Sequence, residues 1–224
     1  MAITDWPIEQ RPRERLLKNG CGGLTDAELL ALVLRVGTAG KSAVDLGHEM
    51  LEHFGSLNAL FAAPLKEFAS LNGLGPAKFA MFQAVFELAQ RALAEEMKHG
   101  SAMNSPLKVR QYLQLELGSL PHETFVVLHL DAQNRLINCE ELFRGTLTHT
   151  SVYPREVVKA ALACNAAGVI LAHNHPSGNP APSHADRLMT QALQTALAVV
   201  EVRILDHVVV AGGKTYSFAE HGDL

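Results

Sequence analysis

The chain has 224 residues, of which 48% are hydrophobic and 19% are charged, a composition that excludes a disordered protein and allows one large or two small domains. Its formal net charge of −4 excludes a general attraction to nucleic acid or to an anionic membrane. Three widely spaced cysteines argue against a disulfide framework, and no apolar stretch approaches the length of a membrane span. We therefore expect a cytoplasmic protein.

Residues 1–100 predict a small all-α domain. Apolar residues at helical spacing alternate here with Gly and Pro. Thr25 is typical of a helix N-cap, so a helix is expected from Asp26 towards Val36. Further helices are expected over Ser42–Phe54, Ser56–Phe61 and Pro64–Leu71, and a longer amphipathic helix ends near Glu96.

The segment before this last helix resembles the hairpin of a helix-hairpin-helix motif. Gly73 and Gly75 allow a tight turn and expose backbone amides beside a helix N-terminus, and Lys78 adds a positive charge. Such an arrangement can hold a phosphate of DNA. In the alternative interpretation the glycines only join two packed helices or present a surface to another protein.

Residues 101–224 predict a second domain of α/β type. The small and polar segment Lys98–Ser105 is expected to link the two domains. Strands interleaved with helices predict an α/β sandwich with a mixed sheet. The expected elements are a helix over Pro106–Leu117, strands over Thr124–Leu130 and Arg135–Phe143 joined by a tight turn, a helix over Pro154–Asn165, a strand over Gly168–His175, a helix over Arg187–Val200, and strands over Arg203–Val210 and Lys214–Phe218.

Two histidines are expected at the exposed end of the apolar strand that begins at Gly168. Side chains alternate along a strand, so His173 and His175 would project to the same side. The Pro- and Gly-rich segment that follows must loop away from the sheet. Ser183 and Asp186 have the spacing of a helix N-cap and its third residue, which places Asp186 on the first turn of the next helix.

Two imidazoles and one carboxylate make a three-ligand set. Catalytic zinc typically has three protein ligands and a water in the fourth position, where the pKa of that water falls to about 7. The pattern therefore predicts one zinc ion per chain and hydrolytic chemistry. Two alternatives stay open: iron(II) also uses two histidines and one carboxylate, and Ser183 with Asp186 could be only a capping box.

The segment His173–Asp186 (HNHPSGNPAPSHAD) resembles the metal motif of the JAMM (MPN+) metallopeptidase superfamily. Leu142–Leu147 (LFRGTL), Tyr153–Glu156 (YPRE) and Leu205–Val210 (LDHVVV) resemble its bacterial RadC branch, and the resemblance covers nearly the whole chain. It implies a fold like that of the cytidine deaminases, although their HxE and PCxxC signature is missing.

The same resemblance implies roles for individual residues. His173, His175 and Asp186 would bind the zinc ion, and Ser183 would orient or stabilise the oxyanion of the tetrahedral intermediate. A separate upstream glutamate would hold the attacking water.

Two glutamates compete for this last role. Glu123 immediately precedes an apolar strand, as the catalytic glutamate of the superfamily does, and we favour it. Glu156 lies at the start of a helix, where a negative charge also favours the helix dipole. Asp206 and His207 lie on the strand after the metal helix, and either could hydrogen-bond a ligating histidine; a satisfied polar pair is the alternative.

The sequence thus predicts a cytoplasmic zinc metallopeptidase that hydrolyses an amide bond of a peptide or isopeptide. The alternative hypothesis is a DNA-associated repair or recombination accessory protein, which the older association of the RadC family with DNA repair would imply. In that protein the hairpin would contact DNA and the zinc site would be mainly structural.

Overall fold

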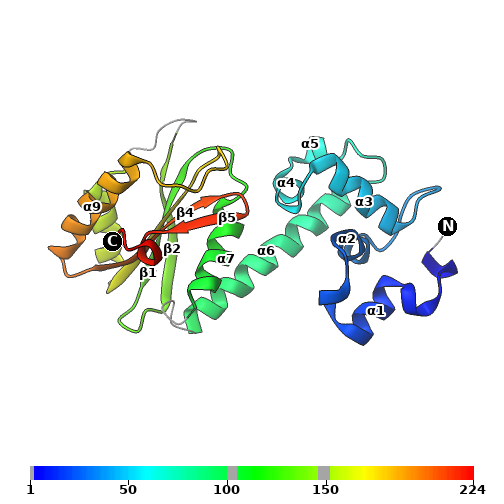
Figure 1. The fold of residues 1–224 in the computed structure, drawn as a ribbon, viewed down its shortest axis with the longest axis horizontal. Helices are drawn as coiled ribbons and strands as arrows, with labels where there is room; N and C mark the ends of the chain where they lie inside the picture. Colours follow the sequence, from blue (N-terminus) through cyan, green and yellow to red (C-terminus); the bar gives the residue numbers. More distant parts are fainter. Residues whose placement is uncertain (1–2, 100–104, 146–151) are drawn as a thin grey trace. The chain divides into compact units, whose positions relative to one another are not determined.

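A computed structural model describes residues 3–99, 105–145 and 152–224. The chain divides into two compact units, Met1–Leu88 and Ala89–Leu224. Each unit has its own hydrophobic core. Figure 1 shows the course of the described residues as a ribbon. Across the described residues, no helix combines the length and the apolar composition needed to cross a membrane.

The first unit is all-helical, as predicted. Its elements are the 3₁₀ turns Ile3–Asp5, Ile8–Gln10 and Cys21–Gly23, the helices α1 (Pro12–Asn19), α2 (Asp26–Leu34), α3 (Ala43–Phe54), α4 (Leu57–Ala62) and α5 (Leu65–Phe68), and the first part of α6 (Pro76–His99). Thr25 and Ser42 begin α2 and α3 with capping boxes, in which the N-cap side chain and the third helical residue bond each other's backbone amides. Helix α1 was not expected from the sequence.

Neighbouring aromatic side chains lie at the centre of the first unit. The ring centroid of Phe68 lies 6.3 Å from that of Phe54 and 5.7 Å from that of Phe82. All three side chains are buried, so α3, α5 and α6 share one core.

Helix α6 belongs to both units. Its C-terminal turns bury Met97 in the core of the second unit, with Leu93 and Ala94 packed against the same core. The units therefore divide after Leu88, within α6, whereas the sequence placed the linker at Lys98–Ser105. Residues 100–104 lie outside the described residues.

The described residues of the second unit form one sheet and four further helices. Its elements are α7 (Pro106–Leu117), β1 (Thr124–Leu130), β2 (Leu136–Arg144), α8 (Pro154–Ala163), β3 (Gly168–Asn174), α9 (His184–Ala198), β4 (Arg203–Ala211), β5 (Lys214–Ser217) and α10 (Phe218–His221). These bounds confirm the predicted order of strands and helices. The short helix α10 replaces the expected end of the last strand.

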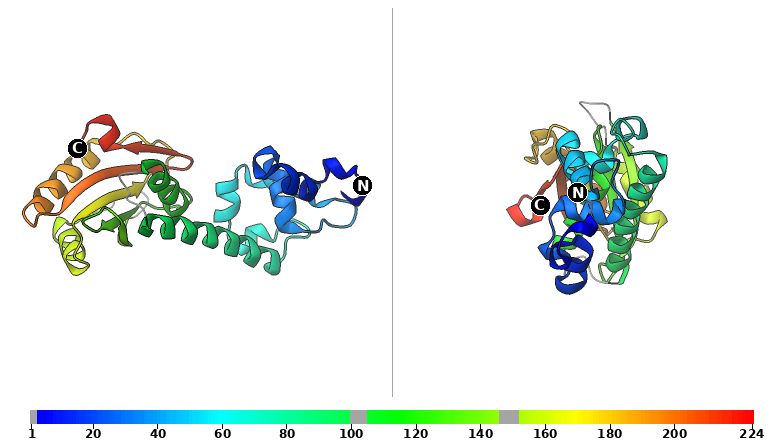
Figure 2. Two further views of the ribbon diagram at one scale, coloured as in Figure 1. Left: turned by 90° about the horizontal axis from the view of Figure 1, so that it is seen from below. Right: turned by 90° about the vertical axis from the view of Figure 1, so that its right-hand side faces the viewer.

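The five strands form a mixed sheet in the order β2-β1-β3-β4-β5. Only β3 and β4 are parallel neighbours; the other pairs are antiparallel. Helix α7 covers one face of the sheet, whereas α8 and α9 cover the other (Figures 1 and 2). The predicted α/β sandwich with a mixed sheet is confirmed.

Candidate metal centre

The candidate site begins at the carboxyl end of β3. All seven residues of β3 are buried, which explains its continuous apolar sequence. His173 follows Val169 and Leu171 on the face that α8 and α9 cover. Beyond the strand, the amide of His175 donates to the carbonyl of Val210 over 2.7 Å. This bond extends the pairing of β3 with β4 to His175. Side chains alternate along a strand, so the imidazoles of His173 and His175 project to one side.

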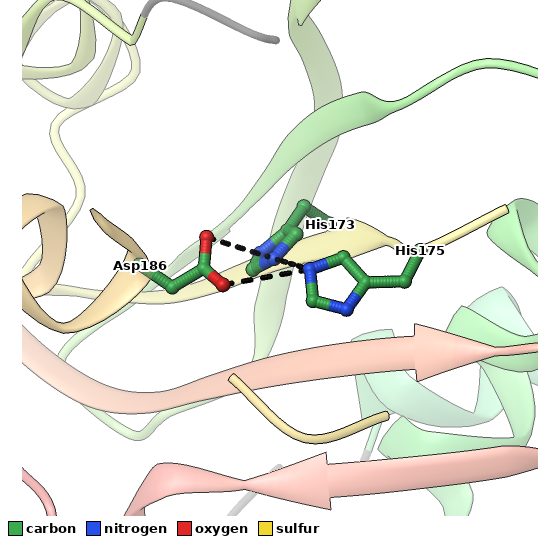
Figure 3. A group of neighbouring side chains, drawn as sticks. All are labelled: His173, His175 and Asp186. Carbon is green, nitrogen blue, oxygen red and sulfur yellow. Dashed lines mark hydrogen bonds and ion pairs between the residues drawn. The ribbon is translucent and has the colours of Figure 1, made fainter. Parts of the chain in front are cut away.

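Asp186 comes to the same place from the first turn of α9. Ser183 is the N-cap: its Oγ accepts from the amide of Asp186 at 3.2 Å and lies 2.7 Å from Asp186 Oδ2, to which it donates. The amide of Ser183 donates to the same oxygen over 2.6 Å. A capping box is therefore present, but the pair is not only a cap, because the carboxylate of Asp186 also faces the two histidines (Figure 3).

Three donor groups converge within the described residues. The Nε2 atoms of His173 and His175 are 3.1 Å apart. Asp186 Oδ1 lies 3.4 Å from His173 Nε2, and Oδ2 lies 3.4 Å from His175 Nε2 (Figure 3). Ligands about 2.0–2.1 Å from a tetrahedral zinc ion are about 3.3–3.4 Å from one another. The donor set thus fits one divalent ion with a coordination position to spare.

The charges of the site favour a cation. Burial acts to raise the pKa of Asp186, but hydrogen bonds with His173 and His175 outweigh it and hold the pKa below its ordinary value. The hydrogen bond to Asp186 raises the pKa of His175, against the opposing effect of burial. The carboxylate is therefore ionised, and a metal would displace a proton from this cluster.

A buried pair lies behind His173. His207 Nε2 is 2.9 Å from His173 Nδ1, and His207 Nδ1 is 2.7 Å from Thr190 Oγ1. Burial, with the neighbouring His173, holds the pKa of His207 well below its ordinary value, so this imidazole is neutral. His207 thus lies where the sequence predicted a hydrogen-bonding partner for a ligand. Sequence reasoning missed Thr190, whose position one turn after Asp186 was the available signal.

Asp206 does not contact the ligands. Its carboxylate accepts hydrogen bonds from Ser217 Oγ at 2.6 Å and from the amides of His207 and Ala219 at 2.7 and 3.0 Å. Asp206 therefore connects β4 to β5 and α10, which matches the alternative of a satisfied polar group for this residue.

The two candidate glutamates are in different surroundings. Glu123 lines a cleft of about 30 Å³ together with His173 and Asp186, and its charge helps to raise the pKa of His175. A cleft of this volume has room for about one water molecule. Glu156 instead pairs with Lys159 at 2.9 Å and Arg155 at 3.1 Å, and it is not among the residues that line the cleft. The structure brings Glu123, and not Glu156, to the cleft of the candidate ligands.

Asn174, which lies between the two histidines in sequence, holds the segment that carries Glu123. Its side chain accepts from the amide of Thr124 at 2.8 Å and donates to the carbonyls of Leu120 and His122 at 3.2 and 3.0 Å. The residue is only 2% exposed. The sequence analysis did not single out Asn174, because its partners lie about fifty residues away.

The predicted DNA-contacting residues lie in the first unit, around the start of α6. Gly73 has a φ of +88°, and a Cβ added there would lie 2.0 Å from Thr38 Cγ2. This packing explains Gly73 without a ligand. The carbonyl of Gly75 accepts from the amide of Phe79 at the start of α6, and Lys78 is half-buried on its first turn. DNA binding stays a prediction.

Comparison with known proteins places the chain in a family. Residues 103–223 match the RadC-like JAB domain, and residues 3–80 match the UPF0758 N-terminal family. The chain belongs to the RadC-like UPF0758 family. UPF0758 proteins of Herminiimonas arsenicoxydans and Janthinobacterium sp. (strain Marseille) are each 66% identical over the full length of both chains. Another, from Aromatoleum aromaticum, is 62% identical over 99% of each chain.

The predicted resemblance to RadC is thereby confirmed. The three candidate ligands and Glu123 all fall within the residues matched by the JAB domain.

Proposed function

We propose that this RadC-like protein is a zinc-dependent metallopeptidase that hydrolyses an amide bond of a peptide or isopeptide. The convergence of His173, His175 and Asp186, with Glu123 in the same cleft, is the observation that carries the proposal. A bound zinc ion would supply hydroxide at neutral pH and polarise a carbonyl group. The free thiols of Cys21, Cys139 and Cys164 suit a reducing cytoplasm.

Glu123 is the proposed general base. A base must lie within hydrogen-bond reach of the water it activates, and the cleft that Glu123 lines is of the size of that water. The carboxylate would take the proton of the water and deliver it to the leaving amine. Because the cleft is too small for a peptide, the substrate would lie across its opening.

For Ser183 we propose a narrower role than the family resemblance implies. Its hydroxyl hydrogen points at Asp186 Oδ2, so it does not point at a substrate oxygen in this state. We propose that Ser183 orients the metal-binding carboxylate. A contact with the oxyanion would require this hydrogen bond to break.

Glu123→Gln tests the proposal, with Glu156→Gln as the matched control. The zinc-loaded protein is incubated with a diverse peptide and isopeptide library, and the products are identified by mass spectrometry. We expect chelator-sensitive cleavage by the parent and Glu156→Gln, and a loss of about 10²–10⁴-fold in Glu123→Gln with its zinc content unchanged. Full activity in Glu123→Gln, or cleavage that resists chelators, would overturn the assignment.

DNA association remains a separate proposal for the first unit, supported by the hairpin sequence and by Lys78. Duplex and branched DNA should bind at low salt and lose affinity in Lys78→Ala, with His173→Ala unaffected. Absence of binding at low ionic strength contradicts it.

A further inference from the structure

We infer that Thr190 and His207 act as positioning residues that direct the lone pair of His173 Nε2 towards the metal, and that Thr190 couples this ligand to Asp186. The inference rests on the proposed metal site. It concerns where three hydrogen atoms lie, which the hydrogen-bond partners decide.

The hydrogen bonds form a series that runs from Thr190 through His207 to His173. This series starts at Thr190 on α9. Its Oγ1 donates to the carbonyl of Asp186 over 2.7 Å, one helical turn earlier. A hydroxyl has one hydrogen and two lone pairs, so Oγ1 can then only accept from a second partner. That partner is His207 Nδ1 at 2.7 Å, which must carry the hydrogen.

The tautomer of His207 decides where the remaining hydrogen atoms lie. A neutral imidazole with hydrogen on Nδ1 has a lone pair on Nε2. His173 Nδ1 lies 2.9 Å from this lone pair and must donate to it. A neutral His173 then has its lone pair on Nε2, the atom that faces His175 and Asp186. The hydrogen that Nε2 shares with Asp186 in the metal-free protein is the one that a metal would displace.

The opposite series would block the site. If Thr190 donated to His207 Nδ1, His207 would donate through Nε2 to His173 Nδ1. A neutral His173 would then carry its hydrogen on Nε2, where the metal has to bind. The carbonyl of Asp186 selects against this arrangement because it accepts the hydroxyl hydrogen of Thr190. One ligand's backbone thus sets the tautomer of another ligand.

The surroundings keep the series fixed. His207 is 0% exposed and Thr190 is 1% exposed, so water does not compete for these bonds. The ring of His207 stacks on Phe218 with centroids 4.7 Å apart, and Phe125 meets it edge-on at 6.0 Å. A ring flip of His207 would require these neighbours to move.

The first test is the tautomer itself. Long-range ¹⁵N–¹H NMR of the metal-free, histidine-labelled full chain at neutral pH reports which nitrogen of His207 carries the hydrogen. We expect hydrogen on Nδ1. Hydrogen on Nε2 would overturn the inference whatever the catalytic activity is.

The second test compares Thr190→Val with Thr190→Ser. Valine keeps the shape but removes the hydroxyl, so zinc affinity measured by chelator competition should fall about 10–100-fold. Serine restores the hydroxyl and should bind zinc within a few-fold of the parent. Equal affinity in the valine variant would contradict the inference; if that variant does not fold, the tautomer of the parent decides.

Neither readout depends on peptide hydrolysis. A protein that binds zinc with the expected tautomer but cleaves no peptide would leave this inference standing and remove the proposed function.

Discussion

Each unit of the chain contains a candidate binding motif, and the structure treats the two motifs differently. In the second unit, the end of β3 and the start of α9 bring His173, His175 and Asp186 to one point, where contacts within the group raise the pKa of His175 and lower that of Asp186. In the first unit, Gly73 is explained by its packing on Thr38. A sequence motif alone does not identify a candidate site. The site is recognised because side chains from different elements converge, which they do in the second unit.

The largest effect is expected from Asp186→Asn. The amide retains an oxygen for the helix cap but removes the negative charge that two histidines surround. Zinc affinity should fall by about 100-fold or more, and the melting temperature of the metal-free protein should also fall, because the change removes the ionised carboxylate that the histidines stabilise. Chelator competition and calorimetry measure the two quantities. Unchanged zinc affinity would mean that Asp186 is not a metal ligand, and the contrast drawn between the two units would fail.

Gly73→Ala tests the packing explanation in the first unit. Its Cβ would overlap Thr38 Cγ2, and its φ of +88° is unfavourable for alanine. We expect a loss of about 2–4 kcal/mol in the free energy of unfolding, measured by urea denaturation. Gly75→Ala is the matched control, since no atom would contact its Cβ, and it should cost less than about 1 kcal/mol. Equal losses in both variants would contradict this explanation.

Asn174→Ala should separate zinc binding from hydrolysis. The change leaves the amide of Thr124 and two carbonyls without their partner, which costs about 1–3 kcal/mol of stability and loosens the segment that carries Glu123. Cleavage should fall while zinc affinity stays within a few-fold of the parent. If cleavage and zinc affinity fell together, Asn174 would support the metal ligands and not the segment that carries Glu123.

A smaller effect is expected from pH. The pKa of His175 is raised in the folded protein, so its proton competes with zinc as the pH falls through that pKa. Zinc affinity should therefore rise from pH 6 to pH 8. In the metal-free protein the sign is opposite: protonated His175 stabilises the fold below its unfolded pKa of about 6.5, and this contribution disappears as the pH rises through the folded value. Melting curves across this range, with and without zinc, check both signs.

Much of the second unit could be predicted from sequence because the signals are local. The apolar run of β3 fixes a buried strand, and the Ser183 cap fixes the start of α9. The ligand trio followed from these two elements and from the JAMM resemblance.

Long-range contacts could not be predicted in the same way. Asn174 meets its partners across about fifty residues, and Thr190 meets His207 across the gap between α9 and β4. The choice between Glu123 and Glu156 also needed the fold, because each lies at the start of a regular element in sequence. The division within α6 was missed since Met97 is buried by side chains far from it along the chain.

The central claim is that His173, His175 and Asp186 hold one divalent metal. Anomalous diffraction at the zinc absorption edge from crystals of the zinc-loaded full chain tests it most directly. The account predicts one ion about 2.0–2.2 Å from both histidine Nε2 atoms and from a carboxylate oxygen of Asp186. An ion bound elsewhere, or an Asp186 carboxylate turned away from it, would contradict the account.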